Sequence, residues 1–146
     1  MDARITWVEG RSFLAESGSG HALVIDGPTS AGGRNIGPAP MELVLLGAGG
    51  CSIFDVVSIL QKSRQKVTDC RLEMRAERAD AAPRVFTRID MHFVVRGRGL
   101  VSDKVARAVQ LSLEKYCSAT AMLGRTAEIG HSFSIEEEEA SPEGGE

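Results

Sequence analysis

Two cysteines, Cys51 and Cys117, are the residues of this chain whose type and setting could do chemistry. Cys51 follows a run of small residues at 47–50, and Cys117 is followed by Ser, Ala and Thr at 118–120. Both windows predict helix, and small neighbours let another backbone or a narrow substrate come close. Two thiols on packed helices can carry out two-electron redox chemistry, in which one sulfur attacks and the other resolves the product. The third cysteine, Cys70, lies on the inward face of a predicted strand and is interpreted as a core residue.

Length and composition bound the class of protein. The 146 residues fit one domain, expected over 1–135, with an acidic tail at 136–146 that is expected to be disordered. With 42% apolar residues, 25% charged residues and a net charge of −3, the composition is that of a globular protein without a nucleic-acid surface. The sequence has no signal-peptide pattern and no uninterrupted apolar run of about 20 residues. We therefore expect a cytoplasmic protein without a membrane partner, whose cysteines are free thiols.

The order of the predicted elements indicates an α+β fold. Alternation and turn residues predict strands at 4–8, 12–16, 21–26, 69–80, 84–96 and 128–135. A Gly- and Pro-rich loop covers 27–40, and helices are predicted from Pro40 to Lys62 or Arg64 and from 102 to 124. Strands in runs, interrupted by two helices, are typical of an antiparallel sheet in an α+β domain.

The first predicted helix is apolar on most of its sides, which predicts a buried central helix. One small sheet cannot cover such a helix, so the pattern favours an intertwined homodimer. Gly47, Gly49 and Gly50 lie inside this helix, and each costs roughly 1 kcal/mol relative to Ala. Close packing, or a ligand against the backbone, is expected to account for them.

Several segments carry a resemblance that covers the chain from Ala3 to about Ile135. They are Trp-Val-Glu-Gly at 7–10, Pro-Met-Glu-Leu-Val at 40–44, Ala-Gly-Gly-Cys-Ser at 48–52, Asp-Val-Val-Ser-Ile-Leu-Gln-Lys at 55–62 and Glu-Lys-Tyr-Cys-Ser at 114–118. With the order of elements, they resemble the OsmC/Ohr family of osmotically inducible and organic-hydroperoxide-resistance proteins, and within it the YhfA-like branch. The resemblance implies an OsmC-like fold and a domain-swapped homodimer with two active sites at the subunit interface.

The resemblance also implies an activity, that of a thiol-dependent peroxidase. In the family, the cysteine matched by Cys51 attacks an organic hydroperoxide and becomes a sulfenic acid. The one matched by Cys117 condenses with it to a disulfide, and a dithiol reductant, often lipoyl-bearing, restores both thiols. No bound cofactor is expected. No metal is expected either, because the histidines at 21, 92 and 131 have no metal-ligand spacing.

One position departs from the family pattern. In the peroxidase branches a Pro-Glu pair opens the helix, and its carboxylate partners an arginine near the reactive thiol. Here Met41 follows Pro40, and Glu42 comes one residue later, about 100° around the helix. Glu42 either orients the arginine, which is Arg11 or Arg34, or is a first-turn acid that favours the helix dipole.

Because Met41 stands where the peroxidase branches have Glu, other interpretations of the function remain open. If neither arginine reaches Cys51, the apolar helix would raise the pKa of that thiol and blunt its reactivity. The runner-up function is an OsmC-fold protein that binds a small apolar ligand at the small-residue pocket without peroxidase activity. A purely structural dimer is the third reading.

Overall fold

The computed structural model describes residues 1–140, which divide into two compact units at the boundary between Leu46 and Gly47. The acidic tail was expected to begin at residue 136, whereas the last strand extends through Glu137. From residue 141 onward the expected tail lies outside the described residues. The two-sheet, three-helix architecture is α+β, as the sequence predicted.

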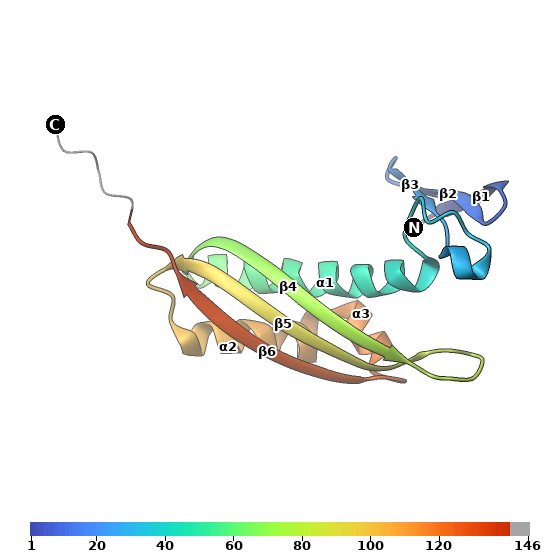
Figure 1. Ribbon diagram of the computed structural model, residues 1–146. Coiled ribbons are helices and arrows are strands. Elements are labelled where there is room, and N and C mark those ends of the chain that lie inside the picture. Colours follow the sequence, from blue (N-terminus) through green and yellow to red (C-terminus); the bar gives the residue numbers. More distant parts are fainter. Residues whose placement is uncertain (141–146) are drawn as a thin grey trace. The chain divides into compact units, whose positions relative to one another are not determined.

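The first unit holds a three-stranded antiparallel sheet in the order β1-β2-β3 (Figure 1). Its strands are β1 (Ala3–Glu9), β2 (Ser12–Ser17) and β3 (Ala22–Ile25). The turn between β1 and β2 places Gly10 at φ 55°, a left-handed conformation that glycine adopts without a Cβ penalty. The predicted meander is therefore confirmed, and the Gly- and Pro-rich loop that follows contains only a short 3-10 turn at Thr29–Ala31.

A buried carboxylate organises that loop. Asp26 is 2% exposed, accepts the backbone N–H groups of Gly27, Arg34 and Ile36, and accepts the Ser12 hydroxyl at 3.0 Å. Burial opposes ionisation, but the N–H groups of Gly27 and Arg34 and the Ser12 hydroxyl outweigh it and lower the pKa of this carboxyl. Asp26 thus fixes the loop through its charged form.

The helix α1 (Pro40–Lys62) begins at the predicted proline and ends at one of the two predicted residues. Its buried residues are Ala48, Gly49, Ser52, Val56 and Leu60, which lie on one face. Apolar side chains on the other faces of α1 are exposed to solvent in the single chain, and Phe54 is 74% exposed. By length and composition alone α1 could cross a membrane, since its mean hydropathy reaches 2.1. The expected burial of this helix is therefore only partial within one chain.

The second unit contains the sheet β4-β5-β6, formed by β4 (Lys66–Arg78), β5 (Phe86–Arg98) and β6 (Glu128–Glu137). β4 and β5 form the predicted antiparallel hairpin, with Leu72 opposite Phe93 and Met74 opposite Met91. β6 pairs with β5 in parallel, which differs from the fully antiparallel expectation. The helical segment between β5 and β6 supplies the crossover that returns the chain to the same end of the sheet, as parallel pairing requires.

The predicted helix at 102–124 is broken in the structure. It consists of α2 (Ser102–Leu111), a π-helical turn η2 (Ser112–Tyr116) and α3 (Ser118–Leu123), with Cys117 between the last two. All three lie with α1 on one face of the β4-β5-β6 sheet (Figure 1). The core between them holds the side chains of Val56, Leu60, Ile89, Met91, Phe93, Val95, Val105 and Val109.

The helix glycines divide into two kinds. A Cβ on Gly49 would lie 2.5 Å from the Met74 sulfur, so this glycine lets α1 pack closely on β4. A Cβ on Gly47 or Gly50 would meet nothing within 4 Å. Close packing therefore explains Gly49, whereas Gly47 and Gly50 leave an open small-residue face on α1 beside Cys51.

Candidate active site

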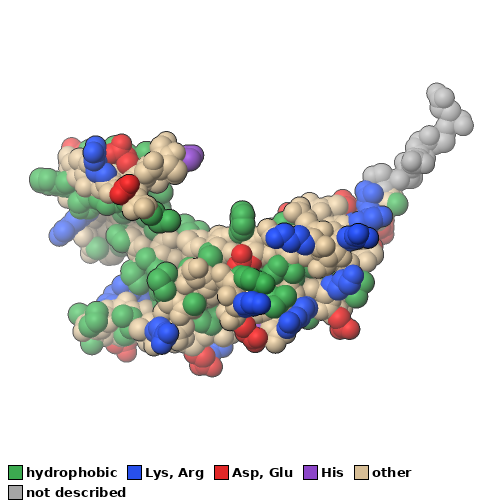
Figure 2. Space-filling model, turned by 180° about the vertical axis from the view of Figure 1, so that it is seen from behind, with side chains coloured by type: hydrophobic (Ala, Val, Ile, Leu, Met, Phe, Trp, Pro, Cys, Tyr) green, Lys and Arg blue, Asp and Glu red, His purple; other side chains and the backbone are tan. Residues whose placement is uncertain are grey.

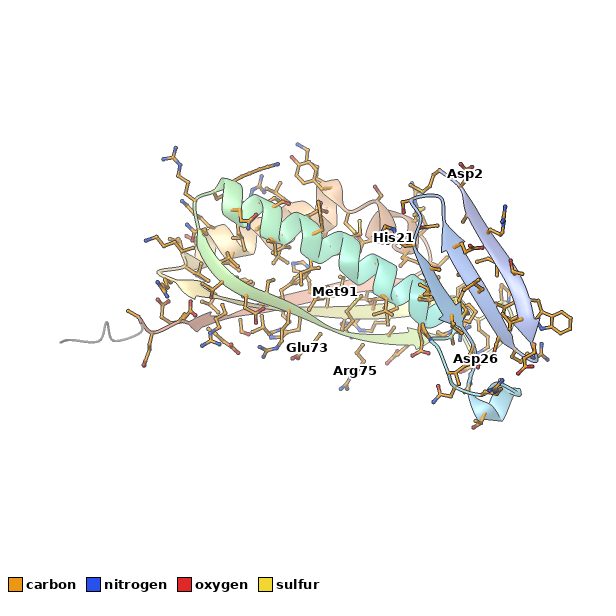
Figure 3. The ribbon with its side chains drawn as sticks, turned by 90° about the horizontal axis from the view of Figure 1, so that it is seen from above. Asp2, His21, Asp26, Glu73, Arg75 and Met91 are labelled. Carbon is orange, nitrogen blue, oxygen red and sulfur yellow. The ribbon has the colours of Figure 1, made fainter. Side chains whose placement is uncertain are left out.

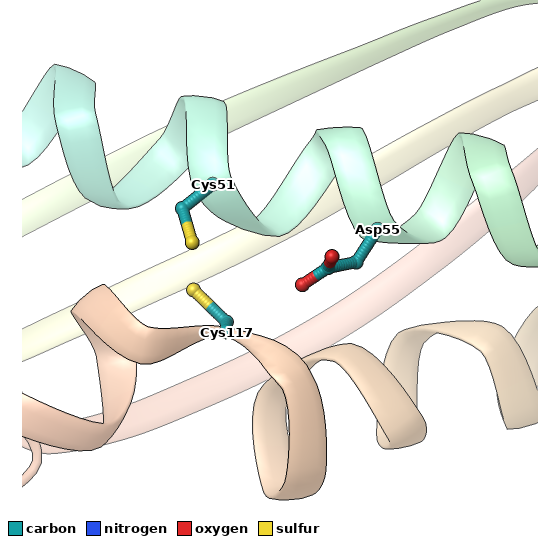
Figure 4. A group of neighbouring side chains, drawn as sticks. All are labelled: Cys51, Asp55 and Cys117. Carbon is teal, nitrogen blue, oxygen red and sulfur yellow. The ribbon is translucent and has the colours of Figure 1, made fainter.

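The two predicted thiols meet in the second unit. Cys51 lies on α1 and Cys117 immediately before α3, and Figure 4 shows their sulfur atoms pointing toward one another. The two Sγ atoms and a carboxylate oxygen of Asp55 all lie within 4.8 Å of one another. All three cysteines are free thiols, with Cys51 half-buried and Cys117 only 2% exposed. The arrangement pairs an accessible sulfur with a buried one.

The break before α3 is what presents Cys117 to α1. The Cys117 N–H donates to the Ser112 carbonyl at 2.7 Å, which closes the π-helical turn, and the backbone then becomes extended at Cys117 (φ −74°, ψ 102°). Cys117 is the N-cap of α3, and its sulfur accepts the backbone N–H of Thr120 at 3.4 Å. Single π-helical turns are frequent at functional sites, and this one replaces the continuous helix that the sequence predicted.

Ser52 connects the two helices at the buried sulfur. Its Oγ lies 3.2 Å from the Cys117 Sγ and donates to the Ala48 carbonyl at 3.0 Å. A hydroxyl has a single proton to donate. When Cys117 is a thiol it can donate to Ser52, and when Cys117 is a thiolate the Ser52 proton can turn from Ala48 to the sulfur.

The surroundings shift the pKa values of the two thiols in opposite directions. The Ala119 N–H favours the Cys51 thiolate, but partial burial and the neighbouring Cys117 outweigh it, and the pKa of the Cys51 thiol is raised. Burial opposes the charge on Cys117, yet hydrogen bonds from Ser52, Thr120 and the Cys51 thiol lower its pKa. In this chain the buried sulfur therefore holds the negative charge more readily, with Cys51 as its proton donor.

Asp55 is a neighbour of the thiols that the sequence analysis did not single out. It follows Cys51 by four residues, so both side chains lie on one face of α1 (Figure 4). Ser112 donates to the Ser52 carbonyl at 3.0 Å and lies 3.4 Å from an Asp55 carboxylate oxygen. The available signal was an acid four residues after a cysteine, in the apolar middle of the helix.

Glu42 and the two arginines belong to the first unit. Glu42 accepts the Ala39 N–H at 3.0 Å, which is the backward contact of a capping box at the start of α1. This contact favours the interpretation of Glu42 as an acid that stabilises the start of the helix. The Arg34 guanidinium pairs with the Glu9 carboxylate. Arg11 is exposed, and its Nε would lie 3.9 Å from a Cβ on Gly32.

The remaining candidates lie away from the thiols. Cys70 is half-buried on β4, where burial and then Asp69 raise its pKa to about 11, consistent with an unreactive core thiol. His92 contacts the hydroxyls of Ser132 at 2.7 Å and Ser134 at 3.2 Å. His131 is exposed in the single chain.

The sheet face away from α1 is polar. It lines a shallow cavity of about 520 Å³, and Figure 3 shows Glu73 and Arg75 pointing away from α1 there. Within this face Arg88 pairs with Asp90 at 2.6 Å and with Glu128 at 3.1 Å. These charges largely satisfy one another, so this face is interpreted as a solvated surface.

Comparison with known proteins agrees with this geometry. Residues 32–132 match the family of OsmC-like proteins. The chain is 53% identical over 135 residues to Protein YhfA of Escherichia coli (strain K12), covering 92% of this chain and 98% of that protein. A solved structural-genomics structure is 50% identical with a TM-score of 0.85, covering 94% of this chain and 100% of the other.

A more distant structure shares the fold. It is an organic hydroperoxide resistance protein from Legionella pneumophila, which is 17% identical with a TM-score of 0.71 over 92% of this chain and 96% of that one. The family match covers most of the chain, and it includes α1 with Cys51 and the turn that carries Cys117. The chain therefore belongs to the OsmC-like protein family.

Proposed function

We propose that this protein is a thiol-dependent hydroperoxide reductase that acts through Cys51 and Cys117. The observation that carries the proposal is the pair of facing sulfurs, held by two different helices within 4.8 Å. A disulfide requires an S–S distance of about 2.05 Å, so the sulfurs must close on one another during turnover.

The difference in burial supports the proposed division of roles. The Cys51 thiolate attacks one peroxide oxygen, the O–O bond breaks, and an alcohol leaves while Cys51 becomes a sulfenic acid. Cys117 then attacks the Cys51 sulfur, water leaves, and a disulfide forms. A half-exposed attacking sulfur can reach a substrate, whereas a sulfur that is 2% exposed is suited to resolving its neighbour. A dithiol reductant, such as a lipoyl-bearing protein, returns both thiols.

Activation of Cys51 is the demanding step, because its pKa is raised in the single chain. The backbone N–H groups of Ala119 and Ser118 favour the thiolate but do not overcome burial and the neighbouring sulfur. A cation at the site would oppose this rise and lower the pKa of the Cys51 thiol. We propose that Arg11 or Arg34 supplies this charge, with Glu42 restricted to an orienting role.

We propose that the working protein is an intertwined homodimer in the cytoplasm. The exposed apolar side chains support a partner surface: Ile5, Trp7 and Val8 on β1, and Val44, Leu46 and Phe54 on α1. Figure 2 shows hydrophobic side chains exposed among the charged ones. A second copy of the chain would cover the apolar faces of α1 that its own sheet leaves open. Light scattering of the purified protein tests this, since a monomeric mass contradicts it.

Peroxide consumption by matched cysteine variants tests the proposed activity. With cumene hydroperoxide and a dithiol reductant, Cys51→Ser is expected to lose turnover. In a separate assay without the reductant, Cys117→Ser is expected to consume about one equivalent of peroxide and leave a trappable sulfenic acid, because no second thiol is present to condense with it. Cys70→Ser is the control and is expected to keep full activity, because its thiol lies on β4 outside the pair. Turnover that survives in Cys51→Ser contradicts the proposal.

A second candidate function is binding of a small apolar ligand without peroxide chemistry. The open face at Gly47 and Gly50 and the raised pKa of Cys51 favour it. Native mass spectrometry of protein purified from its own host tests this candidate. A bound apolar molecule, together with thiols that do not react with peroxide, would support it. An unliganded protein with reactive thiols contradicts it.

A further inference from the structure

We propose that Cys51, Asp55 and Cys117 form a binding site for a thiophilic divalent cation of the zinc type. The site joins two sulfurs and one carboxylate from two helices, and it takes three protein ligands with a fourth position left for water. The inference concerns the reduced protein and does not depend on peroxidase activity. It adds a metal-bound state to a thiol pair for which the sequence predicted no metal.

The distances fit such an ion. Three atoms that lie within 4.8 Å of one another are at most about 2.8 Å from a common centre. Zinc bonds to sulfur at about 2.3 Å and to carboxylate oxygen at about 2.0–2.2 Å. The three side chains therefore need to close by less than about 1 Å, which small torsional adjustments supply.

The ligand set selects the class of metal. Two thiolates and a carboxylate favour Zn²⁺ over Mg²⁺ or Ca²⁺, which prefer oxygen ligands only. Three ligands with an open position resemble catalytic rather than structural zinc sites. The Cys51–Asp55 pair lies one turn apart on α1, so two of the three ligands are fixed by the helix itself.

Neighbouring polar groups hold two of the ligands in place. Ser112 lies 3.4 Å from an Asp55 oxygen, and Ser52 lies 3.2 Å from the Cys117 sulfur. The Thr120 N–H donates to the same sulfur at 3.4 Å. Such outer contacts orient metal ligands and add to metal affinity. Each can persist when the sulfur or the carboxylate also binds a cation.

Binding has a defined consequence for the thiols. Each thiol loses a proton when its sulfur binds the cation, so two protons are released per ion and affinity rises with pH. No electrons are transferred, and both sulfurs remain at the oxidation level of a thiol. A bound ion therefore blocks alkylation of Cys51 and Cys117, and a Cys51–Cys117 disulfide in turn excludes the ion.

Cobalt substitution of the reduced full-length protein tests the site directly. Titration of metal-free protein with Co²⁺ is expected to give a thiolate-to-cobalt charge-transfer band and intense visible bands of tetrahedral Co²⁺, saturating at one ion per chain. Added Zn²⁺ is expected to displace the cobalt and remove the visible bands. Cys51 and Cys117 are then expected to resist alkylation until a chelator is added.

Variants separate this site from adventitious binding. Asp55→Asn keeps the side-chain shape and removes a charged ligand, so affinity should fall about tenfold or more, since outer partners alone are worth 10–100-fold. Cys51→Ser and Cys117→Ser each remove one of the two thiolates, so each should bind Co²⁺ more weakly and lower the intensity of the charge-transfer band, with circular dichroism as the check on folding. Cys70→Ser is the matched control and should bind as the parent does.

Two results overturn the proposal. One is the absence of a thiolate-to-cobalt band at ion concentrations far above those of the protein. The other is a band whose intensity and affinity are unchanged in Cys51→Ser or Cys117→Ser, or a band that Cys70→Ser removes. Neither result bears on peroxide consumption, which is measured with metal-free protein. The metal site and the proposed enzyme activity can therefore fail independently.

Discussion

Replacing Gly49 by alanine tests how closely α1 packs against the sheet that supports Cys51. The new Cβ would lie 2.5 Å from the Met74 sulfur and 3.5 Å from a Leu72 methyl carbon. A distance of 2.5 Å is more than 1 Å shorter than ordinary van der Waals contact, so Met74 or the helix must move. Gly50→Ala is the matched control, because its Cβ would meet nothing within 4 Å.

Both substitutions add the higher helix propensity of alanine to the free energy of unfolding, but only Gly49→Ala also introduces a steric clash. Alanine gains about 1 kcal/mol over glycine in a helix interior, and this gain applies at both positions. Overpacking at Gly49 costs about 1–3 kcal/mol, toward the lower end here because methionine side chains are adaptable. We therefore expect Gly49→Ala to be less stable than Gly50→Ala by about 1–3 kcal/mol.

Thermal unfolding of both variants and the parent, at one protein concentration, measures this difference. For a chain of this size 1 kcal/mol corresponds to about 2–4 °C, so the melting temperatures of the two variants should differ by several degrees. Urea unfolding provides the independent check on free energy. Equal stabilities, or a Gly49→Ala variant more stable than Gly50→Ala, would refute the close packing of α1 on β4.

Two further predictions concern ionisation. Ser52→Ala removes a hydrogen bond to the Cys117 thiolate, so the first apparent pKa of the thiol pair should rise, whereas Ser58→Ala should not change it. Thiolate absorbance of chelator-treated protein against pH measures both, and an unchanged or lower value for Ser52→Ala would contradict the assignment. The pKa of Asp26 is lowered in the folded chain, so its stabilising contribution is present above its ordinary value of 3.8 and is lost as pH falls below it. Asp26→Asn should destabilise the protein at neutral pH and flatten the acid limb of its stability curve, and a stability at neutral pH equal to that of the parent would contradict this role.

The strands and the first helix could be predicted because their signals are local. Alternation along 69–80 and 84–96 gave the hairpin, and Pro40 marked the first residue of α1. The parallel pairing of β6 could not be predicted in this way, since the period of two is the same in parallel and antiparallel strands. Direction depends on where the intervening helices return the chain.

The candidate site was predicted in part. The pair of Cys51 and Cys117 followed from residue type, small neighbours and resemblance, and the structure brings both sulfurs together. The π-helical turn before Cys117 was not predicted, because the apolar spacing over 105–117 continues through it at a helical period. Asp55 was missed because a single acid on a helix is usually a solvated residue. Its relation to the thiols emerges only when α1 and η2 are side by side.

Intact-mass spectrometry of the reduced, metal-free protein after addition of about one equivalent of cumene hydroperoxide tests the proposed function most directly. The expected result is a rapid loss of two hydrogens per chain, which peptide mapping assigns to a Cys51–Cys117 disulfide. An unchanged mass, with all three thiols still open to alkylation after denaturation, would contradict the role of the thiol pair in hydroperoxide reduction.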